Sequence, residues 1–165
     1  MSHDDYRVLA ARIRTELQDI EQVVRRAERA RLLLHQHPGE DVYLDAAAHN
    51  LHDFYTTLER IFLQIARVVD HSAPAGERWH RDLLEQMSFS VPTVRPPVLD
   101  EGTVTQLDEY MRFRHVVRNV YSFRLNPQRV MQLVEEMRPL FDRVRTQLQQ
   151  FAQMLEQWSQ EAQDE

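Results

Sequence analysis

The sequence contains no cysteine, no lysine and only three glycines among its 165 residues. Without cysteine, the chain has no disulfide framework, no thiolate nucleophile and no zinc–thiolate site. Three glycines are too few for a turn-rich β protein, and the dominance of Leu, Arg, Gln, Glu and Ala predicts an all-α fold. No apolar run is long enough to span a membrane, and the acidic start Met-Ser-His-Asp-Asp is unlike a signal peptide. We therefore expect a cytoplasmic protein that does not enter the membrane.

All 20 basic residues are arginines, although the formal net charge is −6. Compositional bias of the source genome is the simpler explanation for this exclusive use of arginine. Every cation is nevertheless a planar fork that can bind phosphate or carboxylate through two hydrogen bonds. The negative net charge opposes non-specific coating of nucleic acid, so any contact with nucleic acid must be local.

The spacing of apolar residues predicts two long amphipathic helices in the first half of the chain. The first ends near His37-Pro38-Gly39, and the second covers about 42–69. A short third helix over about 77–87 and an extended, proline-containing strap over 88–99 follow. The buried stripes of the two long helices are predicted to contain Leu9, Ile13, Leu17, Ile20, Val24, Ala27 and Leu34, and Leu44, Ala48, Leu51, Tyr55, Leu58, Phe62, Ile65 and Val69.

A fourth helix is expected to start near Asp100 or Thr103 and to end at about Phe123. Thr103-x-x-Gln106 has the form of a capping box, in which two side chains satisfy free N–H groups at the helix start. Leu107, Met111, Val117 and Val120 supply the apolar positions of this helix.

A fifth helix follows Asn126-Pro127, which supply an N-cap and a first-turn proline. Pro139 should kink or divide this helix because it removes one backbone donor. Four long helices and one short helix predict an up-down bundle, with one domain over 1–158 and a frayed acidic tail over 159–165. The long helices also offer faces to a second copy, so we expect a homodimer. The inner face of the fifth helix is predicted to contain Val130, Val134, Met137, Phe141, Val144, Leu148, Phe151 and Leu155.

The segment 110–134 contains five arginines and no carboxylate. Charge, bidentate donors and aromatic rings on one helix face suit RNA phosphates and stacked bases. The alternative is a solvated face whose arginines pair with glutamates of other helices; the lack of a local acid and the interleaved tyrosines weigh against it. At helical spacings of four, four and three residues, one side of this helix carries Tyr110, Arg114, Arg118 and Tyr121.

The stretch Phe113-Arg114-His115-x-x-x-Asn119-x-Tyr121 resembles the signature helix of the HEPN superfamily, and specifically of the HepT-like toxins. Their motif is Arg, a polar residue, three residues, His, and then often one residue and Tyr. This resemblance implies a helical bundle that dimerises and cuts RNA without a metal ion or another cofactor.

The likeness extends over most of the chain and includes the segment 49–60 on the second helix. Position by position, it makes Arg114 the motif arginine, His115 its polar neighbour and Tyr121 the motif tyrosine. Asn119 stands where the family has its catalytic histidine, and an amide can bind a phosphate or a water but cannot transfer a proton. No histidine follows His115, which leaves His115 itself as a displaced proton carrier. The catalytic candidates are Arg114, His115 and Asn119, and the RNA-binding candidates are Arg112, Arg118 and Tyr110.

The same resemblance implies a nucleotidyltransferase of the minimal MNT type as an antitoxin partner. In part of the family this partner adds AMP to the motif tyrosine, so Tyr121 is the candidate acceptor; an ordinary buried aromatic is the alternative. An adenylyl group would place negative charge beside Arg114 and Arg118. Two functions follow: a ribonuclease toxin with a degenerate motif, or a non-catalytic HEPN module that binds a nucleotidyltransferase or a nucleotide. A structural interaction bundle is a third.

The remaining titratable residues are interpreted as structural. His49, His52 and Asp53 have helical spacings compatible with a metal site, but too few further ligands accompany them. We therefore expect hydrogen bonds within the bundle and no metal. Glu59 and Arg60 are interpreted as ordinary charged helix surface.

Overall fold

Five helices make up the computed structural model, which describes residues 3–121 and 124–161 and has no β-strand in those ranges. The predicted all-α bundle of four long helices and one short helix is confirmed. No helix in the described ranges combines the length and the apolar character that a membrane span needs. In chain order the helices are α1 (His3–Gln36), α2 (Asp41–Val68), α3 (Trp79–Gln86), α4 (Glu101–Asn119) and α5 (Pro127–Glu161).

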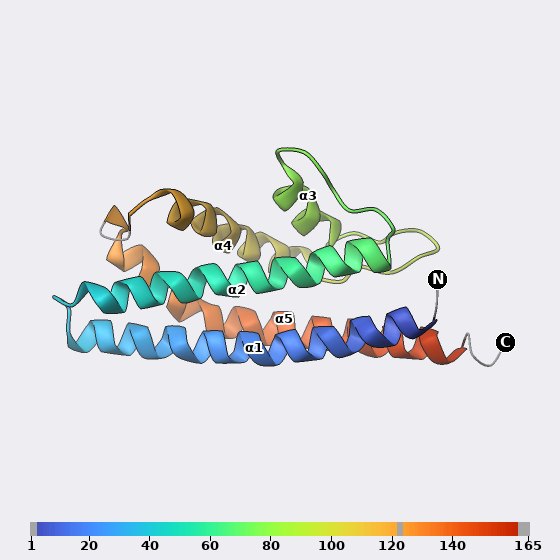
Figure 1. The fold of residues 1–165 in the computed structure, drawn as a ribbon, viewed down its shortest axis with the longest axis horizontal. Helices are drawn as coiled ribbons and strands as arrows, with labels where there is room; N and C mark the ends of the chain where they lie inside the picture. The colour runs from blue at the N-terminus through green and yellow to red at the C-terminus, as the bar shows by residue number, and fades with distance from the viewer. Residues whose placement is uncertain (1–2, 122–123, 162–165) are drawn as a thin grey trace.

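The helix α2 contacts all four other helices and is the central element of the fold. Figure 1 shows α1, α2 and α5 lying alongside one another, with α3 and α4 on the other side of α2 from α1. α1 packs against α2 and α5, whereas α3 and α4 pack mainly against α2 and each other. α2 therefore provides much of the surface against which α4 packs.

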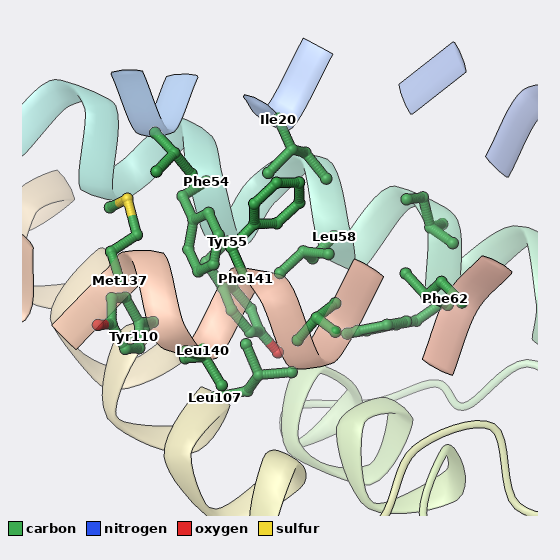
Figure 2. Close-up of a cluster of buried hydrophobic side chains, with 14 of the residues drawn as sticks. Ile20, Phe54, Tyr55, Leu58, Phe62, Leu107, Tyr110, Met137, Leu140 and Phe141 are labelled. Atoms are coloured by element: carbon green, nitrogen blue, oxygen red, sulfur yellow. The ribbon is translucent and has the colours of Figure 1, made fainter. Parts of the chain in front are cut away.

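The core follows the predicted stripes of the long helices. Every residue predicted for the inner faces of α1, α2 and α5 is buried. Figure 2 shows the centre of this core, where Ile20, Phe54 and Phe141 meet from three helices. Each fully buried side chain of this size stabilises the fold by about 1.5–3 kcal/mol relative to exposure. Periodicity was therefore sufficient to predict the core of the three long helices.

The start of α4 is capped by Asp100. Its Oδ1 accepts a hydrogen bond from the backbone N–H of Thr103 at 2.7 Å, and its Oδ2 accepts one from Gln147 of α5 at 2.8 Å. The predicted capping box at Thr103 is wrong, because Thr103 lies in the first turn of the helix and is fully buried. The cap thus also fastens the start of α4 to α5.

The end of α4 lies at Asn119, four residues before the predicted end, and Val120 already has an extended backbone. Phe123 lies outside the described residues. Tyr121 consequently follows the helix instead of lying on it. The fourth helix therefore does not continue the arginine-bearing face as far as the sequence pattern predicted.

The helix α5 starts as predicted, because the side-chain oxygen of Asn126 accepts a hydrogen bond from the backbone N–H of Gln128 at 3.0 Å. Pro139 does not divide it, since α5 is continuous from Pro127 to Glu161. The expected fraying from Ser159 is not seen over 159–161, which are helical, and Ser159 is buried. Residues 162–165 lie outside the described part of the chain.

The strap between α3 and α4 is folded around Arg95 instead of being extended. The Arg95 guanidinium is buried and makes two hydrogen bonds to Asp70, at 2.6 and 2.7 Å. It also donates to the backbone carbonyls of Gln86, Phe89 and Pro96. The guanidinium therefore holds the end of α2, the end of α3 and the strap in one arrangement.

We predict that Asp100→Ala destabilises the fold by about 0.5–2 kcal/mol near neutral pH, because it removes the cap of α4. The hydrogen bond from the backbone of Thr103 lowers the folded-state pKa of Asp100. Its contribution is therefore fully present above the unfolded pKa of about 3.9 and is lost as pH falls through the folded value. Urea unfolding at several pH values measures this.

Asp100→Asn is the matched control, because it retains a capping oxygen without the titration. The difference between the parent and Asp100→Ala should shrink on acidification. A difference that stays constant from about pH 7 to about pH 3 would show that the ionised carboxylate adds nothing to the cap.

Candidate functional site

Arg114, the motif arginine, lies inside the bundle and not on its surface. It is 6% exposed. Its Nη1 donates to Oε1 of Glu59 on α2 at 2.6 Å, and its guanidinium lies 5.4 Å from the ring centre of Tyr55. Burial raises the pKa of Tyr55, so this ring is a neutral neighbour of the cation. Arg114 is therefore bound to α2 through both a charge and an aromatic face.

His80 on α3 completes this buried cluster. Its Nδ1 lies 2.7 Å from Oε2 of Glu59 and 2.9 Å from Nη2 of Arg114. One ring nitrogen cannot donate and accept at once, and a carboxylate only accepts. We therefore assign the proton to Nδ1, which donates to Glu59, while the guanidinium contacts the ring. The ring of Trp79 stacks on the ring of His80, and their centres lie 3.6 Å apart.

The sequence pattern did not identify Glu59 and His80 as partners of Arg114. Glu59 was interpreted as charged surface, which is wrong, because it is only 6% exposed. Its position four residues after Tyr55 places it at the edge of the buried stripe, a signal that could have identified it. His80 lies on a short helix and carries no motif. The Glu59–Arg114–His80 cluster joins α2, α4 and α3.

Tyr110 does not face the surface either. Its hydroxyl donates to the backbone carbonyl of Leu133 at 2.6 Å, and its ring lies 5.3 Å from that of Phe54. Figure 2 shows Tyr110 within the hydrophobic core, and burial raises its pKa. The predicted strip from Tyr110 to Tyr121 is therefore not one continuous surface, and Tyr110 does not present its ring to nucleic acid.

His115 and Asn119 are exposed on the outer side of α4. The Asn119 side-chain amide donates to the backbone carbonyl of His115 at 2.8 Å, so it is used within its own helix. Arg114 points into the bundle instead. The structure therefore does not bring the three predicted catalytic residues together within one chain.

Two of the remaining arginines of the segment are paired with nearby carboxylates. Arg112 forms an ion pair with Asp108 at 2.7 Å, and Arg129 with Glu109 at 3.3 Å. The pair of Arg129 with a glutamate of another helix is the alternative that the sequence left open, whereas Arg112 pairs with an aspartate of its own helix. Arg118 differs: it is exposed, and no hydrogen bond or ion pair to it occurs within residues 3–121 and 124–161.

Arg118 lines an open groove of about 440 Å³ between α2 and the end of α4, called here the α2–α4 groove. Tyr121, just beyond the helix, is 72% exposed. The groove is lined by Asp45, Ala48, His49, His52 and Asp53 of α2, by Val117, Arg118 and Val120, and by Leu125. It is the place where an exposed cation of the arginine-rich segment meets titratable side chains of another helix.

The histidines of this groove share one carboxylate. His49 Nε2 lies 3.1 Å from Oδ2 of Asp53, and His52 Nδ1 lies 3.5 Å from Oδ1 of the same residue. The predicted hydrogen bonds of these histidines are thus made on the surface of α2, not in the core. Within the described residues, no group of three or more His, Asp or Glu is placed to hold a metal ion.

We predict that Glu59→Gln destabilises the protein by about 3–5 kcal/mol, because it leaves the buried Arg114 cation without a carboxylate. Urea unfolding followed by circular dichroism measures the loss. The double variant Glu59→Gln/Arg114→Gln removes both charges and should recover a large part of it.

The matched control is Asp108→Asn, which breaks the exposed pair with Arg112 and should cost about 0.3–0.5 kcal/mol. Equal small losses for Asp108→Asn and Glu59→Gln would show that the buried pair does not hold α4 in place.

Comparison with known proteins identifies a relationship over most of the helical bundle. A family model described as HepT-like protein matches residues 46–155. The match covers about two thirds of the chain, from within α2 to within α5, and includes Glu59, His80 and Arg114. No curated protein and no solved structure matches the chain. The chain belongs to the HepT-like family of the HEPN superfamily.

Proposed function

We propose that this protein is the toxin component of a HepT-type toxin–antitoxin pair in the cytoplasm, and that it binds and cuts RNA at the α2–α4 groove. The observation that carries this proposal is Arg118. It is exposed, it lines the groove, and it has no carboxylate partner in the described part of the chain. Family membership supports a HEPN-type module, and the groove gives that module a place for a phosphate.

The chemistry of the groove suits a single-stranded RNA. A guanidinium donates two parallel hydrogen bonds to a phosphodiester, and an aromatic ring stacks on a base. Arg118 in the groove supplies the first group, and the exposed ring of Tyr121, which follows α4 but does not line the groove, supplies the second. Because the net charge of the protein is −6, RNA must be attracted by this local surface and not by the molecule as a whole.

Cleavage of RNA without a metal ion also needs proton transfer. Position 119 supplies none, because an amide has no titratable proton in the working pH range. Loss of a proton-transfer group typically lowers the rate by about 10²–10⁴-fold. We therefore expect slower cleavage than a complete HEPN motif would give.

A homodimer is part of this proposal. Val116 of α4 and Val120, which follows α4 and lines the groove, are 44% and 36% exposed, and exposed apolar side chains favour association. Across such a contact, His115 and Asn119 of one copy would come near His115 and Asn119 of the other.

A second candidate function is a non-catalytic module that binds an MNT-type nucleotidyltransferase or its nucleotide. Two observations favour it. The Asn119 amide is bonded to its own helix, and Arg114 is held by Glu59 and His80 instead of facing solvent. Under this alternative, Arg118 binds the phosphate of a nucleotide and no RNA is cut.

We predict that Arg118→Ala weakens binding of a short, labelled oligoribonucleotide by about tenfold or more, because one charge-assisted bidentate contact is lost. Fluorescence anisotropy at fixed salt measures the dissociation constant. Arg26→Ala, which removes an exposed arginine of α1, is the matched control and should bind as the parent does. If Arg118→Ala and Arg26→Ala bind the oligoribonucleotide equally well, the RNA does not bind at Arg118.

Cleavage separates the two candidate functions. Gel analysis of the oligoribonucleotide should show cutting by the parent and faster cutting by Asn119→His, which restores the family motif. Binding without cleavage by the parent supports the non-catalytic module. Arg114→Ala is a poor probe, because it leaves the buried Glu59 charge unpaired.

We predict that Tyr121 is the residue to which an MNT-type partner transfers AMP, since its ring is 72% exposed. Incubation with the partner and ATP should add the mass of one AMP to the parent and none to Tyr121→Phe. Tyr43→Phe, altered at a half-buried tyrosine of α2, is the control and should be modified normally. Modification of Tyr121→Phe would contradict the assignment.

A further inference from the structure

The α2–α4 groove contains a cation and two imidazoles within one surface depression. α4 supplies Arg118, and α2 supplies His49 and His52, one turn apart. His52 is half-buried, with 27% of its side chain exposed, and His49 is 69% exposed. Residues on both sides of Asn119 in the chain, Arg118 and Val120, line the same groove. Proton carriers of α2 therefore line the same groove as the two sequence neighbours of the position where the motif lacks its histidine.

Asp53 sets the chemistry of both imidazoles. Its two oxygens face Nδ1 of His52 and Nε2 of His49, at 3.5 and 3.1 Å. A carboxylate accepts from an N–H, so we assign the proton of His52 to Nδ1, which leaves a lone pair on Nε2. A carboxylate that orients a histidine in this way is the usual arrangement around a general base.

The other histidines near α4 are less suited to act as the general base. The Nδ1 of His80 is bonded to the buried Glu59, its ring contacts Trp79 and Arg114, and it does not line the groove. His115 lies on the outer side of α4 and does not line the groove. His52 and His49 are the histidines that share the groove with Arg118.

Resting on the function proposed above, we propose that His52 and His49 transfer the protons of RNA cleavage that Asn119 cannot transfer. Arg118 binds the non-bridging oxygens of the scissile phosphate. His52 Nε2 takes the proton of the ribose 2′-hydroxyl as O2′ bonds to phosphorus. The bond from phosphorus to O5′ breaks, and protonated His49 gives O5′ its proton. The products are a 2′,3′-cyclic phosphate and a 5′-hydroxyl, and solvent returns both histidines to their starting forms.

The charges around the two histidines set the geometry of binding. Asp45 and Asp53 of α2 and Arg118 of α4 are the charged groups that line the groove. The two carboxylates repel a phosphate, so the phosphate lies at the Arg118 side with the histidines next to it. One base and one acid predict a bell-shaped dependence of the cleavage rate on pH.

The experiment measures cleavage and binding separately. Cleavage of a labelled oligoribonucleotide is followed by its 2′,3′-cyclic phosphate product, and binding by anisotropy with a 2′-O-methyl analogue that cannot be cut. His52→Gln should lower the cleavage rate by about 10²-fold or more and leave the dissociation constant unchanged, and His49→Gln should behave similarly. Each variant should also lose one limb of the pH profile. His35→Gln, at an exposed histidine of α1, is the matched control for folding and for contaminating nucleases.

The double variant Asn119→His/His52→Gln separates this inference from the proposed function. Restoring the motif histidine supplies a proton carrier at position 119, so the double variant should cut RNA again. If the parent cuts RNA and His52→Gln cuts it equally well, the inference is overturned and the ribonuclease function stands. The same holds if cleavage is lost only in His80→Gln. Cleavage by Asn119→His alone, with an inactive parent, also overturns it. Failure of every version to cut RNA overturns the ribonuclease function itself.

Discussion

The ion pair between Glu59 and Arg114 determines how α4 lies in this molecule. Burying two charges has a desolvation cost, and the pair offsets it only because further groups complete the contacts: His80 donates to the same carboxylate, and Tyr55 lies against the guanidinium. These groups come from three helices. The guanidinium can meet all of them in only one rotation of α4 about its axis, so the cluster specifies which face of α4 turns inward.

That rotation explains the different environments of the arginines on α4. Arg114 lies inside and Arg118, one turn further on, lies in the groove, although a sequence pattern places them on one side. α4 ends directly after Asn119, so the later residues leave the helical face and Tyr121 projects into solvent. The inward arginine thus makes its contacts within the bundle, and the outward arginine lines the groove.

The predictable part of the structure is the part set by local periodicity. The inner stripes of α1, α2 and α5 followed from apolar spacing, and Asn126 was recognised as a cap because its partners are its neighbours in sequence. Glu59 and His80 could not be assigned in this way, because an ion pair between helices depends on how the helices pack. Tyr110 shows the same limit: its aromatic ring fits either an RNA surface or a core, and only packing against Phe54 decides.

Replacement of the motif histidine changes what the neighbouring residues must do. In a complete motif, arginine and histidine act from the same helix; here the arginine is committed to Glu59 and the amide of Asn119 to a backbone carbonyl. The proposed chemistry therefore depends on groups that line the groove, namely Arg118 and the α2 histidines next to Asp53. α2 therefore supplies one carboxylate to the buried cluster, Glu59, and one to the groove, Asp53.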